Sequence, residues 1–561
     1  MYDSANRIID SLTQDTIREI TFETMKFSLL VVAFAPLASG FHLQYRDCEG
    51  SVRHVHLAVG PDPSSSMTVS FSSIPAESGK QVYGAVLIGR DPHRFEQAIL
   101  EDEDPIFYTS QQPRDEKNYT SPYQHHITIQ GLRPHTTYHY MCVTRSSFEE
   151  ILELQANLDQ WQIDGKSKAM EFDEEADELQ SEMKDDFRRR LNDRLLMEAA
   201  MLHRRLAPPP YDSTRCECPD PYKIRSFSTA PGPGHGKTKV AVIGDIGQFP
   251  HSEEVLDHLR RHHGDIDTII LAGDLAYPEL DHRRWDTFMD FFDDYPLIEN
   301  VPMHITPGNH DIDKPSAGNQ VFAAYETRFR MPRVKPAQLG TYNGPTGPLN
   351  MDRPPYPLDY EYGNAYYAFR YGKTHQIFIN SYSAMEPGSK QYEWLVHELE
   401  GVNRKETPWL LVTYHVPIYN TFEVHQHDEQ MFKTREFIEP LLVKYKVNLV
   451  FNGHIHAYLR TKPVAFGKVS KTGPVHIVMG AGGRAAKASF LHDEPEDFVE
   501  IRDATIYGYG LLDICNQTHA RWDWVHTGQE GDHNVVYKED VILPPGGVDH
   551  TYFVNQYFMD E

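Results

Sequence analysis

Side chains that bind metal ions well recur in five short blocks along this chain. The blocks are GDIG at 244–247, GDLAY at 273–277, GNHD at 308–311, VTYH at 412–415 and GHIH at 453–456. Their seven candidate metal ligands are Asp245, Asp274, Tyr277, Asn309, His415, His454 and His456. Oxygen and imidazole donors in this mixture suit Fe, Mn or Zn. The blocks therefore predict a metal centre.

The number and type of these ligands predict two ions. Seven ligands exceed the four that a structural zinc site takes, and they suit two ions that share one carboxylate. Two metal ions about 3.5–4 Å apart are the usual clamp for in-line displacement at phosphorus. In that chemistry a metal-activated hydroxide attacks, and both ions stabilise the charge of the transition state. The tyrosine is the unusual donor, because a phenolate favours a ferric ion.

The elements around the blocks are consistent with a site at the edge of a sheet. Apolar runs such as KVAVIGD, TIILAGD and NLVFNGHIH lead into the polar ligands. Each run predicts a buried strand that passes a residue to the loop at its carboxyl end. Helical patterns such as SEEVLDHLRRHH and KQYEWLVHELEGV alternate with these strands, which indicates βαβ units. Ligand sites in layered α/β folds gather at the carboxyl ends of the strands.

At these residues the chain resembles the purple acid phosphatases, within the metallophosphoesterase superfamily. All five blocks stand in the order of that family, and the flanking segments RRWDTF at 283–288, GSKQYEWL at 388–395 and VMGAGG at 478–483 agree with it. The resemblance extends from about His54 to the carboxyl terminus, with one insertion. Tyr277 distinguishes the purple branch from the rest of the superfamily.

The resemblance implies two ligand sets joined by Asp274, which would bridge both ions. The set for Fe(III) is Asp245, Tyr277 and His456. The set for one divalent ion is Asn309, His415 and His454. These ligand types leave the divalent ion open among Zn, Mn and Fe.

Three residues beside the ligands are expected to act on the substrate or on a ligand. His310 follows Asn309 and is expected to point into the site and contact phosphate. His425 stands where the family has a substrate-facing histidine, and is the first choice of general acid for the leaving alkoxide. Relatives from plants often have two consecutive histidines there, whereas this chain has Val424 before His425. Asp311 is expected to hydrogen-bond a ligand histidine.

The resemblance implies an acid phosphatase that releases inorganic phosphate from small phosphomonoesters without a phosphoenzyme. One alternative is a phosphodiesterase or nucleotide pyrophosphatase of the same superfamily, which Tyr277 argues against. The other is a non-catalytic, metal-binding adhesion protein, which the retention of every ligand argues against. The physiological substrate stays open, because specificity lies in loops around a generic phosphate site.

Length and charge exclude some classes of partner. The chain has 561 residues, which predicts two or three structural units. Its formal net charge of −27, with no basic stripe, argues against nucleic-acid binding. No segment is long enough to predict a membrane span. The oligomeric state stays open, with a homodimer as one option.

The amino-terminal segment predicts export. Residues 27–38 form a 12-residue apolar run, too short for a bilayer span and typical of a signal peptide. We therefore expect a signal peptide at 25–40, preceded by a gene-model extension at 1–24. The expected location is secreted, extracellular or vacuolar. Five cysteines leave one unpaired or intermolecular, and the sequons at Asn118 and Asn516 suit a secreted glycoprotein.

The chain divides into two predicted domains. Residues 54–231 are expected to form a fibronectin-III-like β-sandwich, interrupted at about 146–215 by a charged, helical insertion. The insertion is interpreted as a surface excursion, with a lid or oligomer contact as the alternative. Residues 236–540 are expected to form an α/β metallophosphoesterase domain of two packed mixed sheets flanked by helices, followed by a tail at 541–561. The segment 312–362 is expected to be a loop that lines the cleft.

Overall fold

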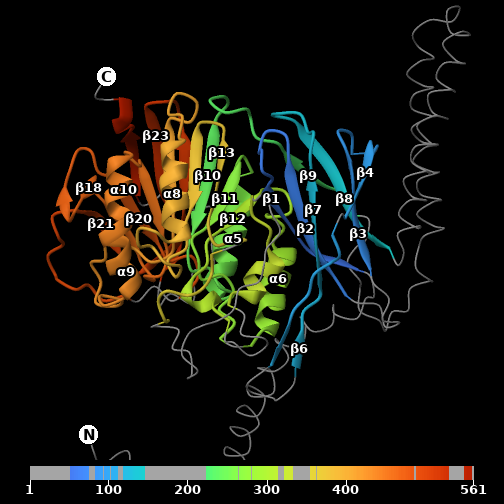
Figure 1. Cartoon of the computed structure of the whole chain (residues 1–561), viewed down its shortest axis with the longest axis horizontal. Helices are drawn as coiled ribbons and strands as arrows, with labels where there is room; N and C mark the ends of the chain where they lie inside the picture. Colours follow the sequence, from blue (N-terminus) through green and yellow to red (C-terminus); the bar gives the residue numbers. More distant parts are fainter. Residues whose placement is uncertain are drawn as a thin grey trace, which may run out of the picture. The chain divides into compact units, whose positions relative to one another are not determined.

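The computed structural model describes residues 51–145, 223–529 and 549–558, with gaps at 75–81, 93, 102, 112–117, 263, 280, 314–320, 333–353, 362 and 485–487. The predicted signal peptide and the insertion at 146–215 lie outside the described residues. The first described part is an antiparallel β-sandwich (Figure 1). One sheet has the order β1 (Val52–Val59), β2 (Met67–Ser73), β7 (Tyr123–Ile129). The other has the order β4 (Gln97–Leu100), β3 (Tyr83–Gly89), β8 (Thr137–Arg145), β9 (Arg225–Ser228).

The sandwich closes around side chains that alternate along its strands. Leu57, Val69, Val86 and Tyr140 from both sheets belong to one buried cluster, as period-two patterning requires. The last strand, β9, comes from beyond the insertion and pairs with β8. A separate hairpin of β5 (Thr109–Gln111) and β6 (Asn118–Thr120) extends from this part.

The α/β part contains two mixed sheets. The six-stranded sheet has the order β12 (Met303–Ile305), β11 (Thr268–Leu271), β10 (Thr238–Ile243), β22 (Ile506–Ile514), β23 (His519–Gln529), β24 (Asp549–Val554). Its β10, β11 and β12 are parallel, and the other pairings are antiparallel. The expected tail at 541–561 thus contains a strand, β24, that extends this sheet.

The seven-stranded sheet has the order β13 (Tyr367–Tyr371), β14 (Thr374–Phe378), β15 (Trp409–Thr413), β16 (Leu449–Asn452), β20 (Val475–Met479), β17 (Tyr458–Thr461), β21 (Val499–Asp503). Its central strands β14, β15, β16 and β20 are parallel. A β-sandwich followed by an α/β part with two mixed sheets confirms the predicted fold class.

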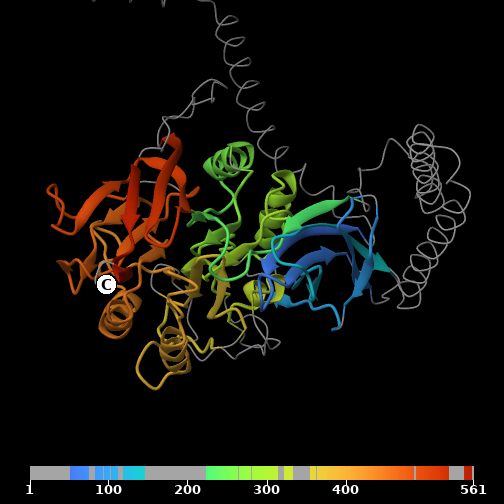
Figure 2. The same ribbon diagram turned by 90° about the horizontal axis from the view of Figure 1, so that it is seen from above.

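Helices flank the sheets (Figures 1 and 2). They are α5 (Pro250–His262), α6 (Arg283–Asp294), α7 (Ala323–Arg328), α8 (Lys390–Glu400), α9 (Glu429–Lys433) and α10 (Glu439–Lys444). Helix α8 begins at Ser389, whose side chain accepts a hydrogen bond from the Tyr392 backbone N–H. Its Leu395 and Leu399, one turn apart, pack in the cluster under the seven-stranded sheet. The expected loop at 312–362 is in part the helix α7.

Buried polar contacts join the sandwich to the α/β part. Arg53 and His54 of β1 both contact Asp290 of α6, with His54 Nε2 at 2.8 Å from the carboxylate. The Tyr119 hydroxyl donates a 2.8 Å hydrogen bond to Asp286, and Arg328 Nη2 lies 2.7 Å from the same carboxylate. Helix α6 therefore contacts strand β1 and the β5–β6 hairpin through charged side chains as well as through apolar ones.

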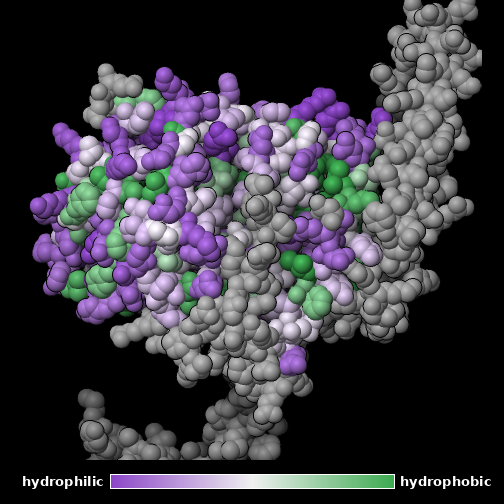
Figure 3. Space-filling view, in the orientation of Figure 1, coloured by the Kyte–Doolittle hydropathy of each residue, from purple (hydrophilic) through white to green (hydrophobic). Residues whose placement is uncertain are grey.

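The surface of the described residues is mixed in character. On the face in Figure 3, hydrophilic side chains predominate and hydrophobic ones lie scattered among them. No helix in the described ranges combines the length and the apolar character that crossing a bilayer needs.

Candidate metal centre

Five of the seven predicted ligands follow the carboxyl ends of parallel strands. Asp245, Asp274 and Asn309 come after β10, β11 and β12 of the six-stranded sheet. His415 and His454 come after β15 and β16 of the seven-stranded sheet. Because parallel strands end at the same edge of a sheet, each sheet delivers its ligands from one edge, and the two edges meet at one centre.

Four of the predicted ligands have left-handed backbone conformations. The φ angles are 54° at Asp245, 52° at Asp274, 48° at Tyr277 and 71° at His454. Such a conformation costs a residue other than glycine on the order of 1–3 kcal/mol, and it persists only where the surrounding structure enforces it. This concentration of strain in three of the motif blocks is typical of a functional site.

Glycines in the blocks leave room for ligands from other blocks. A Cβ added at Gly308 would lie 2.0 Å from Asp274 Oδ1, and one at Gly453 would lie 2.3 Å from Asp245 Oδ2. Neither carboxylate could keep its position beside a larger residue. The glycines of GNHD and GHIH are therefore required by close approach between blocks that are distant in the sequence.

Asp245, Tyr277 and His456 form the first group of donors. The Tyr277 hydroxyl lies 3.3 Å from Asp245 Oδ1 and 3.1 Å from His456 Nε2. His456 Nε2 in turn lies 3.4 Å from Asp245 Oδ1. Asp245 and Tyr277 are fully buried, whereas the His456 side chain is 27% exposed. Burial raises the pKa of Tyr277 well above its usual value.

Asn309, His415 and His454 form the second group. Asn309 Oδ1 lies 2.9 Å from His454 Nδ1 and 3.1 Å from His415 Nε2. The other nitrogen of His415, Nδ1, lies 2.7 Å from the Ala272 carbonyl oxygen. A carbonyl oxygen can only accept a hydrogen bond, so Nδ1 carries the proton. The lone pair of Nε2 is then free to bind a metal ion.

Asp274 lies between the two groups. Its Oδ1 is 3.4 Å from His415 Nε2 and accepts a 2.9 Å hydrogen bond from the His310 backbone N–H. Asp245, Asp274 and His415 each place a potential ligand atom within 4.8 Å of the others. Burial alone would raise the pKa of Asp274. The charges of His415 and His310 outweigh this effect and hold the pKa of Asp274 far below its usual range.

The buried carboxylates of the centre need positive charge close to them. Burial alone would lower the pKa of His415, but Asp274 and then Asp245 raise it to about 9. Burial raises the pKa of Asp245, which has Asp274 as a neighbour. Two buried carboxylates so close together are stabilised only by positive charge nearby. Hard oxygen donors with imidazoles satisfy the requirements of two bound ions.

His310 is held by a carboxylate that sequence reasoning missed. Its Nδ1 lies 2.8 Å from Glu279 Oε1, and its ring centroid lies 4.5 Å from that of Tyr277. Burial lowers the pKa of His310, but Asp274 and then Glu279 raise it above its usual value overall. Glu279 stands two residues after Tyr277, just beyond the GDLAY block, which is the one signal in the sequence that could have found it.

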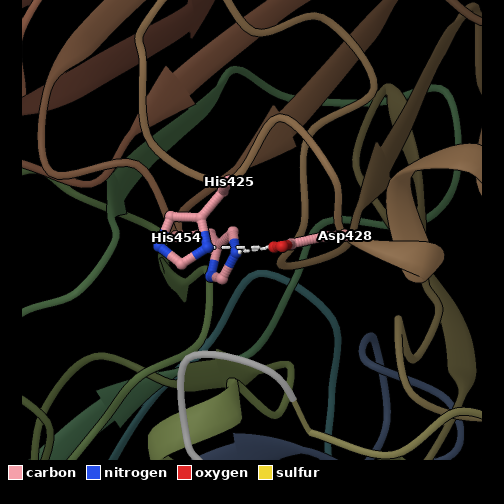
Figure 4. Close-up of side chains that lie close together, drawn as sticks. All are labelled: His425, Asp428 and His454. Carbon is pink, nitrogen blue, oxygen red and sulfur yellow. Dashed lines mark hydrogen bonds and ion pairs between the residues drawn. The ribbon is translucent and has the colours of Figure 1, made fainter.

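His425 also has a carboxylate partner that was not predicted. Asp428 Oδ2 lies 3.0 Å from His425 Nδ1 and 2.7 Å from His454 Nε2, as Figure 4 shows. The ring centroids of the two histidines are 3.9 Å apart, which places His425 beside the second group of donors. His427 is exposed, and no hydrogen bond from its ring is found within the described ranges.

The prediction for Asp311 is wrong. Its Oδ1 accepts a 2.9 Å hydrogen bond from the Leu275 backbone N–H, and its Oδ2 accepts one of 2.9 Å from Gly308. The carboxylate therefore fixes the backbones of two ligand blocks to each other instead of orienting a ligand histidine. Burial and the nearby Asp274 raise the pKa of Asp311 to about 7.

Three family models match the chain. Calcineurin-like phosphoesterase matches residues 238–458, which contain every block of the centre. Iron/zinc purple acid phosphatase-like protein C matches 473–537. Purple acid phosphatase N-terminal domain matches 52–156.

Similar proteins agree with these models. Probable purple acid phosphatase 20 of Arabidopsis thaliana is 34% identical over 327 residues, which are 58% of this chain and 69% of the relative. Purple acid phosphatase 18 of the same plant is 36% identical over 287 residues, 51% of this chain and 58% of the relative. The solved purple acid phosphatase PPD1 from yellow lupin has the same fold, with a TM-score of 0.59 at 18% identity over 85% of this chain and 72% of that one.

Proposed function

The chain belongs to the purple acid phosphatase family, and we propose that its phosphomonoesterase centre is the one assembled by the five motif blocks. Membership makes the chain a hydrolase with a binuclear metal centre. The observation that carries the proposal is the convergence of six donors, in two groups of three, on either side of Asp274. The substrates are small phosphomonoesters, which a centre of two cations binds through the phosphate oxygens.

The proposed ions differ between the two groups of donors. Fe(III) is assigned to Asp245, Tyr277 and His456, because a phenolate favours a hard trivalent ion. A divalent ion, Zn, Mn or Fe, is assigned to Asn309, His415 and His454. Asp274 is the carboxylate that both share. When bound, the two ions supply the nucleophilic hydroxide and the positive charge that the transition state needs.

His310 and His425 act on the substrate in this proposal. His310 contacts a phosphate oxygen, and Glu279 holds its ring through Nδ1. His425 protonates the oxygen of the leaving alcohol from Nε2, since its Nδ1 is turned toward Asp428. The left-handed backbone of His425, with a φ of 59°, supports a functional role, because such strain gathers at functional sites.

Substitution of Asp274 tests the assignment of the centre. Asp274→Ala is expected to remove activity and most of the bound metal, because no other side chain serves both ions. Metal content by elemental analysis and turnover of nitrophenyl phosphate measure the two effects. The bridging role is excluded if the variant keeps both ions and more than about a tenth of wild-type turnover, a loss that a residue outside the ligand set could cause.

The substrate class is tested with matched esters. The wild-type protein is expected to hydrolyse nitrophenyl phosphate faster than the bis-nitrophenyl ester. The reverse preference indicates a phosphodiesterase. Two bound ions without hydrolysis of any phosphoester indicate an adhesion protein.

We also propose that the chain enters the secretory pathway. The apolar run at 27–38 supports this, and both sequon asparagines, Asn118 and Asn516, are exposed where a glycan would need access. The mature chain is expected to begin shortly after Ser39. Amino-terminal sequencing of secreted protein that recovers a residue before Met25 contradicts this.

A further inference from the structure

One carboxylate oxygen contacts two histidines that have different tasks in the centre. Asp428 Oδ2 lies 2.7 Å from Nε2 of His454 and 3.0 Å from Nδ1 of His425 (Figure 4). The Asp428 side chain is only 10% exposed, so solvent competes little for these contacts. A carboxylate in this position can orient both rings at once.

The contact with His454 determines which nitrogen of that ring is available to an ion. A proton on Nε2 is donated to Asp428, which leaves the lone pair of Nδ1 free. That Nδ1 lies 2.9 Å from Asn309 Oδ1, on the side of the second group of donors. His454 is buried, so its ring has few alternative partners. Asp428 therefore holds His454 in the tautomer and orientation that a metal ligand needs.

The contact with His425 works in the same way on the other ring. Its Nδ1 faces Asp428, which leaves Nε2 for the substrate. The backbone before it is already fixed, because Asn420 Nδ2 donates a 2.7 Å hydrogen bond to the Val424 carbonyl. Ring rotation about the side-chain bonds is the freedom that remains, and the bond to Asp428 removes it.

The local structure does not explain an aspartate at this position. Asp428 occupies the N-cap of α9, where an aspartate normally accepts a hydrogen bond from the backbone N–H of the first turn. Its side chain makes no such bond here. Helix α9 therefore lacks the usual capping hydrogen bond, and the Asp428 carboxylate contacts the two histidines instead.

We propose that Asp428 is a positioning residue that couples the metal ligand His454 to the general acid His425. One oxygen sets the orientation of both rings. The ring of His425, which faces the leaving-group oxygen, is thereby held in a fixed position relative to the ring of His454, which faces the divalent ion. The half that concerns His425 rests on the proposed phosphatase function. The half that concerns His454 is a statement about metal binding alone.

Asp428→Asn is the informative substitution, because it keeps the size of the side chain and no cap bond is lost. At the position of Oδ2 it places either a neutral amide oxygen, which accepts more weakly than a carboxylate, or an NH₂ group, which cannot accept from either ring. Turnover of an alkyl phosphate is expected to fall about 10–100-fold, the usual range for such partners of a ligand. Turnover of nitrophenyl phosphate, whose leaving group needs little protonation, should fall less.

Two further readouts separate positioning from a general structural defect. Competition with a chelator should show weaker retention of the divalent ion in Asp428→Asn, measured by elemental analysis without any substrate. In a His425→Ala background, Asp428→Asn should no longer change the ratio of alkyl to aryl turnover. Asp428→Glu should recover part of both properties.

Glu429→Gln is the matched control. Glu429 is the next residue, is exposed and also carries a negative charge at the start of α9. Its substitution should leave turnover, leaving-group dependence and metal retention unchanged.

The proposal is overturned if Asp428→Asn retains the divalent ion like the wild type and lowers alkyl and aryl turnover equally. A third ion per chain that disappears in Asp428→Asn also overturns it, because the cluster would then be a metal site. If the wild-type protein hydrolyses no phosphoester, the proposed function fails, while the chelator measurement still decides the role of Asp428 at His454.

Discussion

Tyr277 is the residue that reports most directly on the identity of the first ion. Its hydroxyl lies among Asp245 and His456 in a buried position. A phenolate bound to Fe(III) absorbs visible light by charge transfer, and none of the other six proposed ligands does so. The oxidised protein is therefore expected to be pink to purple.

Tyr277→Phe is expected to remove the colour and leave part of the hydrolysis. Six ligands remain for the two ions, and the tyrosine itself does not attack phosphorus. An absorption spectrum, with iron content measured on the same sample, tests this. A colourless wild-type protein with stoichiometric iron contradicts the ligand assignment and favours a generic metallophosphoesterase.

At the residue scale, the sequence identified candidate ligands that the structure brings together, because each lies in a short block after an apolar run. Glu279 and Asp428 were missed for a physical reason. Glu279 lies 31 residues from His310, and Asp428 lies 26 residues from His454, although it is only three residues from His425. Asp428 in particular precedes a helix, and an aspartate there predicts a cap; only the folded loop shows its contacts with two histidines.

At the scale of elements, the junction between β1 and α6 is a buried ionic cluster. Asp290 of α6 contacts both Arg53 and His54 of β1, and all three side chains are nearly inaccessible. Removal of one partner of a buried charge pair leaves the other charge uncompensated, at about 3–5 kcal/mol. Asp290→Ala is therefore expected to lower the melting temperature strongly, which calorimetry measures.

The exposed pair Arg90–Glu96 provides the control for that experiment. Its side chains are 43% and 39% exposed, and exposed pairs contribute about 0–1 kcal/mol. Glu96→Gln should hardly change the melting temperature. A loss in Asp290→Ala no larger than that of Glu96→Gln shows that the junction does not depend on this cluster.

The strands and helices were predictable where one regular spacing of apolar residues ran through the whole segment. Buried parallel strands such as β10 and β16 read as unbroken apolar runs. The sequence does not indicate strand β24 within the expected tail, because the strand is short, lies on the outer edge of the sheet and alternates in burial. The sequence does not indicate helix α7 within the expected loop, because its six residues give less than two turns of periodicity.

At the scale of the whole molecule, buried histidines are expected to limit the stability of the fold in acid. His476 of β20 is buried, and neither of its ring nitrogens has a hydrogen-bond partner among the described residues. Burial lowers its pKa to about 3. Burial likewise lowers the pKa of His304 to about 3 and that of His56 to about 4. These side chains fold in their neutral form.

The direction of the pH effect follows from proton binding. The unfolded chain protonates such a histidine near pH 6.5, whereas the folded chain does so only near pH 3 for His476. Between these values the unfolded state binds more protons, so stability is complete above about pH 6.5 and falls as the pH decreases toward 3. One such group contributes up to about 1.4 kcal/mol per pH unit in this window.

His476→Leu is expected to make the protein less sensitive to acid. Leucine is close to histidine in volume and has no group to protonate, so the strand can keep its packing against Tyr419. Any constant change in packing shifts the melting temperature equally at each pH. The difference in melting temperature between variant and wild type should therefore rise steadily from pH 7 to pH 4.5. The exposed His492 provides the control, since His492→Gln should give a difference that does not vary with pH. A constant difference for His476→Leu as well would show that protonation of His476 does not limit the folded state, and the acid limit would then lie with the carboxylates.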